Sequence, residues 1–312
     1  MPDSAYQPGL HRFAVFTALC TLLLLVAGAL VTSNDAGLAV PDWPLSYGSL
    51  LPPMVGGIFW EHGHRTVATF VGILTIVLAV WIARRDPRPW MRKLGWIALA
   101  MVVAQGVLGG LTVLFFLPRP VSITHAALAQ LFFCTTVSIA LFTGRWWQAH
   151  HASLDDAAPP AVRRAAVFSF AAIFVQLLLG ASFRHNAIGI LPHIVWAFVV
   201  AGVAGWTSRV VRQRAGNVPF LRTAASALSA LVGIQILLGA ATFWAVWSTR
   251  NDPQPMPVMV ITTVAHLALG AVALAASTLL ALGCFRVTRP APAEVSAAES
   301  AQHLAGLREP AR

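Results

Sequence analysis

The chain has 312 residues, of which 57% are hydrophobic and only 10% are charged. A soluble domain carries about 25% charged residues, so this composition excludes an ordinary soluble enzyme and indicates an integral membrane protein. The net charge of +10 is distributed unevenly along the chain, in a way that fits a membrane topology and not a surface that binds nucleic acid.

Eight apolar segments are long enough to cross a hydrocarbon core of about 30 Å, which takes about 20 helical residues. They lie near residues 13–33, 64–83, 94–116, 122–142, 165–183, 191–211, 222–246 and 259–284. The first segment is too long for a typical signal peptide and is predicted to be an uncleaved helix. Cys20, Cys134 and Cys284 fall inside these segments, so we expect packing residues and no disulfides.

The basic residues set the expected orientation of these helices. Of the 21 Lys and Arg residues, 17 fall on the side that holds the N-terminus. The other side has Arg65, Arg119, Arg184 and Arg250. Because cytoplasmic loops are enriched in Lys and Arg, both termini are predicted to be cytoplasmic in a multi-pass protein of the cell membrane.

A short pattern recurs in alternate segments, with Gln one helical turn before Gly. It reads QGVLG at 105–109, QLLLG at 176–180 and QILLG at 235–239, whereas the first segment has LLVAG at 24–28. Each Gln is expected to donate a hydrogen bond, either to a neighbouring helix or to a cofactor.

The repeat predicts an all-α integral membrane protein, with eight transmembrane helices arranged as two pseudo-symmetric four-helix bundles. The N-terminal half is expected to cover residues 1–145 and the C-terminal half residues 163–290. A cytoplasmic linker is predicted at 146–162 and a disordered tail at 291–312.

The segment after each of these patterns carries one histidine near its start: His64, His125, His193 and His266. Pairs of imidazoles from facing helices commonly hold heme, whereas a zinc site would more usually add carboxylates or thiolates. None of the four has a second histidine about 20 Å deeper along its helix, which at 1.5 Å per residue is roughly 13 to 14 residues. The pattern indicates heme sites near the outer face and disfavours a chain of hemes across the membrane.

The stretch EHGHR at 61–65 adds polar groups to the first of these sites. Glu61 and His64 are spaced i, i+3 and share a helix face, so the carboxylate is placed to accept a proton near a bound porphyrin. Arg65 is suited to pair with a heme propionate. The alternative is that Glu61 and Arg65 are solvated residues at a helix start. Because the second half has no equivalent, one site is expected to be catalytic and the other to hold a cofactor.

The eight segments, GLAVPDWPLSYG at 37–48 and EHGHR at 61–65 together resemble the heme A synthase family, from about residue 13 to 285. The resemblance implies a membrane oxidoreductase of a bacterial plasma membrane. It would oxidise a porphyrin methyl group of heme O to a formyl group through hydroxylated intermediates, for the cofactor of cytochrome oxidase.

The same resemblance implies a role for each site residue. His64 and His125, with Arg65, would bind the substrate heme O, and Glu61 would be the catalytic acidic residue. The axial ligands of a heme b cofactor would be His193 and His266. Expected partners are heme O synthase, an electron acceptor, the lipid bilayer and a second copy of the chain.

The first outer loop departs from one pattern of this family. Many bacterial members have a pair of cysteines there, whereas residues 34–48 contain none. Its prolines at 41, 44, 52 and 53 predict a defined backbone path. The loop is expected either to cap the substrate heme or to be merely a stiff outer loop.

Two other functions fit parts of the sequence. A non-catalytic diheme cytochrome would relay electrons to a partner near the outer face, and a transporter would bind a metal or heme in transit. The presence of Glu61 in only one half favours an enzyme over a relay. A transporter would have Pro-broken helix interiors, whereas these prolines fall mostly in loops or at helix ends.

Overall fold

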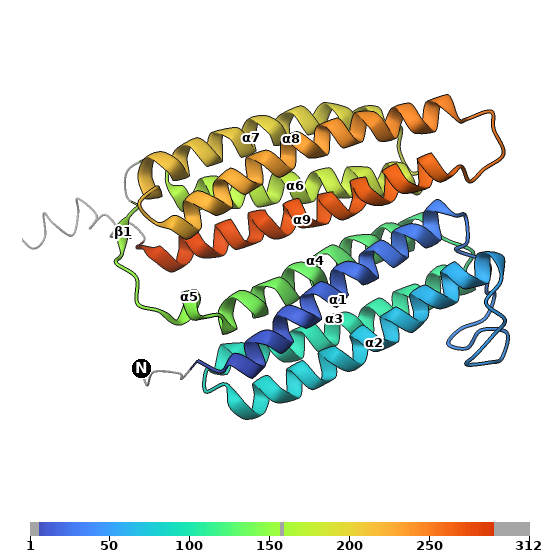
Figure 1. Cartoon of the computed structure of the whole chain (residues 1–312), viewed down its shortest axis with the longest axis horizontal. Helices are drawn as coiled ribbons and strands as arrows, with labels where there is room; N and C mark the ends of the chain where they lie inside the picture. The colour runs from blue at the N-terminus through green and yellow to red at the C-terminus, as the bar shows by residue number, and fades with distance from the viewer. Residues whose placement is uncertain (1–5, 157–158, 290–312) are drawn as a thin grey trace, which may run out of the picture.

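Eight long helices run back and forth along one direction in the computed structural model, which describes residues 6–156 and 159–289 (Figure 1). They are α1 (Pro8–Ser33), α2 (Gly56–Arg85), α3 (Pro89–Leu114), α4 (Arg119–Thr143), α6 (Val162–Arg184), α7 (Leu191–Ala215), α8 (Pro219–Ser248) and α9 (Pro257–Val287). Each is long and apolar enough to cross a membrane, which confirms the eight predicted spans. The predicted disordered tail lies outside the described residues.

Most of these helices begin several residues earlier than the apolar segments indicate. A proline stands at the first or second helical position of α1, α3, α4, α7, α8 and α9. Proline suits these positions because its ring fixes φ near the helical value and its missing N–H has no intrahelical acceptor there. The prolines therefore start the helices in the polar flanks of the apolar segments.

The helices of each half pack as a closed set of neighbours. In the N-terminal half α1 contacts α2 and α4, and α3 contacts the same two helices. In the C-terminal half α6 contacts α7 and α9, and α8 contacts the same two. Figure 1 shows α6 to α9 on one side of the molecule and α1 to α4 on the other. The pseudo-symmetry between the halves stays a prediction.

Helix α9 joins the two halves. It packs on α1 and α4, and α4 also contacts α6. Ala271 and Ala275 of α9 are buried here against Leu25 of α1 and Phe133 of α4. Small residues allow helices to approach closely in a bilayer, where van der Waals packing rather than the hydrophobic effect drives association.

The linker between the halves has more structure than expected. It contains the short helix α5 (Arg145–Gln148) and the strand β1 (Leu154–Asp155), which pairs in parallel with β2 (Thr288–Arg289) after α9. The Arg286 guanidinium donates to the carbonyls of Trp147 at 2.9 Å and Ala149 at 2.8 Å. These bonds fasten the linker to the end of α9.

Candidate heme-binding site

The four repeated histidines lie at one end of the helices, where residues 34–55 connect α1 to α2. We call this the loop end (Figure 1). His64 lies in α2, His125 in α4, His193 in α7 and His266 in α9. All four helices start at the loop end and all four histidines come early in them, so the predicted common depth follows from the topology.

Each imidazole packs against a glycine of the preceding long helix. A Cβ atom added to that glycine would lie 3.0 to 3.4 Å from the imidazole Cε1 atom, in the pairs Gly28–His64, Gly109–His125, Gly180–His193 and Gly239–His266. Separations of this size are tighter than nearly all real Cβ contacts. The repeated glycines therefore make room for the histidine rings.

The repeated glutamines lie one turn away and bind the backbone of the same histidines. The Nε2 atoms of Gln105, Gln176 and Gln235 donate to the carbonyls of His125 at 3.0 Å, His193 at 3.0 Å and His266 at 2.8 Å. Of the two expected roles for these glutamines, the structure shows the link to a neighbouring helix. Helix α1 has Leu24 at the equivalent position and makes no such bond among the described residues.

The histidine pair of the C-terminal half has a spacing that fits a metal between two imidazoles. The rings of His193 and His266 lie 6.2 Å apart between centroids, at an interplanar angle of 77°. Metal–imidazole bonds are about 2 Å long, so two imidazoles on opposite sides of one ion have ring centres roughly 6 Å apart.

The hydrogen bonds of His193 suit a ligand as well. Its Nδ1 atom lies 3.2 Å from the carbonyl of Gln176, the partner that typically fixes the tautomer of a ligating histidine. In that tautomer Nδ1 donates, and the lone pair of Nε2 faces the Gln176 side-chain amide at 3.4 Å. These observations fit the predicted heme b ligands.

In the N-terminal half, His64 and His125 have ring nitrogens without partners. Their Nδ1 atoms are buried and make no hydrogen bond within the described residues, and the same holds for His266. Leaving a buried polar atom unpaired costs about 1–3 kcal/mol, which a hydrogen-bond acceptor or donor from a bound group could offset. The role of His64 and His125 as heme ligands stays a prediction.

A residue of the C-terminal half reaches toward this N-terminal site. His185, at the end of α6, interacts electrostatically with His125. The adjacent Arg184 donates from Nη2 to Ser33 Oγ of α1 at 3.1 Å. Burial, and then the charge of Arg184, lower the pKa of the His185 imidazole, which favours its neutral form. His185 is half-buried.

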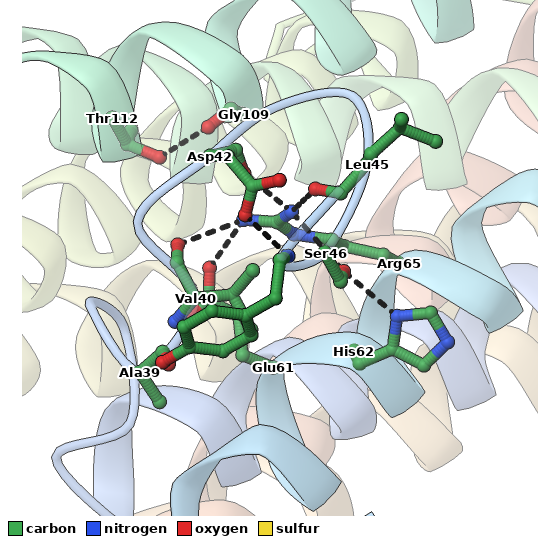
Figure 2. Close-up of polar contacts among 11 residues, drawn as sticks. Ala39, Val40, Asp42, Leu45, Ser46, Glu61, His62, Arg65, Gly109 and Thr112 are labelled. Atoms are coloured by element: carbon green, nitrogen blue, oxygen red, sulfur yellow. Dashed lines mark hydrogen bonds and ion pairs between the residues drawn. The ribbon is translucent and has the colours of Figure 1, made fainter. Parts of the chain in front are cut away.

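Glu61 and Arg65 form a buried ion pair that holds the α1–α2 loop (Figure 2). Glu61 is only 4% exposed, and its Oε1 lies 2.6 Å from Arg65 Nη2. Its Oε2 accepts the N–H of Val40 at 2.8 Å. The alternative of a solvated glutamate is therefore wrong for Glu61.

The Arg65 guanidinium donates hydrogen bonds to backbone carbonyls of the same loop. Nη1 donates to Asp42 O at 2.7 Å and Leu45 O at 2.8 Å, while Nη2 also donates to Val40 O at 3.2 Å. Both terminal nitrogens are therefore engaged by the protein. A heme propionate that paired with Nη1 or Nη2 of Arg65 would have to displace one of these partners.

The loop is fixed to three further points at the loop end. The indole of Trp43 lies on Gly110 of α3, where an added Cβ would be 2.7 Å from the ring. The Ser46 hydroxyl lies 2.9 Å from His62 Nδ1. Gly57 of α2 faces Ala39 so closely that an added Cβ would lie 2.7 Å from the alanine methyl. The defined path that the prolines predict is confirmed, and Trp43 reaches the glycine next to Gly109.

Asp42 closes a turn within the loop and makes this turn sensitive to acid. Its carboxylate accepts the N–H groups of Tyr47 at 2.7 Å and Gly48 at 2.8 Å, and these bonds lower the pKa of the Asp42 carboxyl below its usual value. These two bonds stabilise the turn fully above the ordinary pKa of an aspartate carboxyl. Their contribution is lost as the pH falls through the lowered pKa of Asp42.

We expect exchange of the Tyr47 and Gly48 amide hydrogens, corrected for the intrinsic rate, to accelerate on acidification below about pH 4. Asp42→Asn should exchange faster at neutral pH and lose this dependence. Equal protection of both amides in the two proteins at every pH would contradict the assignment.

The three cysteines are free and buried in the helices, as expected. Two contacts at the site were missed in the sequence. The i, i+4 spacing of Glu61 and Arg65 was a signal for their ion pair. The approach of His185 to His125 joins two halves of the chain and had no local signal.

Comparisons with known proteins agree with the expected family. Residues 55–192 match the family model of the cytochrome oxidase assembly protein. The heme A synthase of Shouchella clausii (strain KSM-K16) is 37% identical over 133 residues, which is 41% of this chain and 44% of the relative. That of Symbiobacterium thermophilum is 31% identical over 169 residues, 53% of this chain and 55% of the relative.

A third relative, the heme A synthase of Geobacillus kaustophilus (strain HTA426), is 26% identical over 186 residues, 58% of this chain and 57% of the relative. The chain thus spans about half the length of the curated relatives it matches. The family match includes Glu61, His64, Arg65 and His125 and ends just before His193. Over residues 55–192 this chain is therefore similar to the cytochrome oxidase assembly protein family, and the relatives that it matches in part are named heme A synthases.

Proposed function

We propose that this chain is a heme A synthase, a membrane oxidoreductase that converts the heme O methyl group to a formyl group through hydroxylated intermediates. Conversion of the methyl group to a formyl group, with the oxygen taken from one water molecule, releases four protons and four electrons, so it needs a proton acceptor and an electron acceptor. An enzyme that makes heme O must supply the substrate. The curated relatives, which carry this activity in their names, support the proposal.

The observation that carries the proposal is the difference between two similar histidine pairs. His193 and His266 form a pair at 6.2 Å whose described surroundings include no carboxylate bonded to either ring. His64 has Glu61 one turn away on the same helix. A relay of electrons needs no such carboxylate, whereas oxidation of a methyl group does need a proton acceptor.

We assign His193 and His266 as the axial ligands of a heme b cofactor. Heme held in this way supplies one-electron chemistry when it is bound. The chain's own contribution is to hold the two imidazoles at a fixed spacing. Gly180 and Gly239 limit the positions of the rings, and Gln176 and Gln235 hold the backbone.

We assign His64 and His125 to the substrate heme O, with Glu61 as the proton acceptor. Glu61 is only 4% exposed, and its carboxylate is paired with Arg65 at 2.6 Å. The loop segment with Trp43 would cover the substrate and exclude bulk water. A carboxylate buried at this position is a suitable group to take protons as the methyl carbon is oxidised.

Pigment analysis of the purified protein tests this proposal. Absorbance and mass measurements on extracted pigment should find heme b together with heme O or heme A. Protein purified from a host that makes heme O should contain heme b and, in addition, either heme O or heme A. Heme b alone under these conditions would favour a plain cytochrome and would contradict the enzyme.

We also propose that both termini are cytoplasmic and that the heme sites lie toward the outer face. The 17-to-4 division of Lys and Arg supports this orientation. Reporter fusions at residue 150 should give a cytoplasmic signal and fusions at residue 50 an outer-side signal. The reverse pattern would move both sites to the cytoplasmic face.

A further inference from the structure

Three of the four histidines are held by two contacts from the preceding helix, and the fourth is held by one. At His125, His193 and His266, a glycine limits the position of the ring and a glutamine amide binds the backbone carbonyl. At His64 only the glycine contact is present, because Leu24 replaces the glutamine. We call the three histidines that have both contacts the anchored histidines; they are His125, His193 and His266.

The two contacts restrict different motions. A helix carbonyl has a second lone pair, so the glutamine bond adds to the helical bond and ties the histidine backbone to its neighbour. The imidazole also lies so close to the glycine that a Cβ atom added there would be 3.0 to 3.4 Å from the ring, and this close packing restricts movement of the ring toward the neighbouring helix. Together they fix both ends of the side chain. A histidine with the ring contact alone lacks the backbone restraint from the preceding helix.

The helix segment that carries His64 is tied to the loop instead. Glu61 and Arg65, which flank His64 in sequence, bind Val40, Asp42 and Leu45 of the loop. Movement of this loop would therefore act on the helical turn of His64. The start of α2 makes a different set of contacts from the starts of α4, α7 and α9.

We propose that His193 and His266, which are both anchored, are permanent ligands, and that His64, which has no glutamine bond, is an exchangeable ligand whose position follows the α1–α2 loop. The N-terminal site then releases its heme while the C-terminal site retains it. This inference rests on the proposed function, since it requires heme at both sites. It adds a physical basis for which half holds substrate and which holds cofactor.

Heme transfer to a scavenger protein tests the proposal without measuring activity. The purified protein is loaded with hemin and mixed with excess apomyoglobin, and absorbance follows the transfer. We expect a fast phase from the N-terminal site and a slow phase from the C-terminal site. His193→Ala should remove the slow phase and leave the fast one.

Changing the anchors should change these phases separately. Gln235→Leu should accelerate the slow phase at least about fivefold, and Leu24→Gln should slow the fast phase by a similar factor. Gln130→Leu is the matched control, because Gln130 of α4 is also buried and makes no bond to a histidine among the described residues. The control should leave both phases unchanged.

The glycine contact has a matched control on the same helix. Gly239→Ala would place a methyl group 3.0 Å from His266, whereas an added Cβ at Gly233 of α8 meets nothing within 4 Å. Gly239→Ala should shift the low-spin absorbance bands and accelerate the slow phase, and Gly233→Ala should do neither. The bands would not move if the glycine merely packed the helices.

The outcomes separate this inference from the proposed function. A wild-type protein that takes up no hemin would contradict the proposed function itself. If Gln235→Leu and Leu24→Gln left the rates of both transfer phases unchanged, the anchoring inference alone would be overturned. A fast phase that disappears with His193→Ala would place the exchangeable heme in the C-terminal half and would also overturn it.

Discussion

Replacing His266 with alanine should abolish the low-spin heme spectrum of the purified protein, and replacing His193 should have the same effect. Each change removes one of two imidazoles that lie 6.2 Å apart, and the remaining imidazole leaves the iron with a single protein ligand. We expect heme b content to fall at least about tenfold, which corresponds to about 1.4 kcal/mol in binding free energy.

The matched control is His150→Ala, because His150 is exposed and lies at the opposite end of the helices. Its spectrum and heme content should equal those of the wild type. Absorbance of the reduced protein and a pyridine hemochrome assay give both quantities. An unchanged low-spin spectrum in both ligand variants would place the cofactor elsewhere.

Glu61→Gln should reduce the heme A formed by at least about tenfold, equivalent to about 1.4 kcal/mol of transition-state stabilisation. The amide keeps the size of the side chain but removes the charge and the proton-accepting role. Heme O, or a partly oxidised form of it, should accumulate. Heme b should remain bound through His193 and His266. Chromatography of hemes extracted from cells at matched protein level measures all of these.

The ion pair with Arg65 requires a second variant to separate chemistry from loop anchoring. If Glu61 only held the loop, Arg65→Gln would give the same loss of heme A and the same exposure of residues 34–55 to protease. If Glu61 accepts protons, Glu61→Gln should lose activity while the loop resists protease as in the wild type. Wild-type heme A from Glu61→Gln would remove this carboxylate from the mechanism.

The architecture was predictable because hydrophobicity over about 20 residues is a strong local signal. The first residues of the helices were less predictable, because polar flanks such as 89–93 and 119–121 do not have the hydrophobicity of a membrane span. Their prolines, Pro89 and Pro120, were the better signal for the first helical turn. Hydropathy therefore located the spans, and local backbone chemistry set their ends.

The site was predictable to the extent that it repeats. The recurrence of Gln, Gly and His at matched positions identified His125 and its counterparts, and the structure places each Gly against its His. The carbonyls that surround Arg65 come from a loop whose path depends on tertiary contacts, such as Trp43 on Gly110. No periodicity in the sequence encodes such contacts.

Conversion of heme O by the chain itself is the most direct test of the proposed function. Membranes from a host that lacks heme A but makes heme O should be compared with and without the expressed chain, and their hemes extracted and identified by chromatography and mass. We predict that heme A appears only with the chain and falls at least about tenfold with Glu61→Gln. Heme O that stays unconverted, in membranes where the protein is present and carries heme b, would contradict the assignment as a heme A synthase.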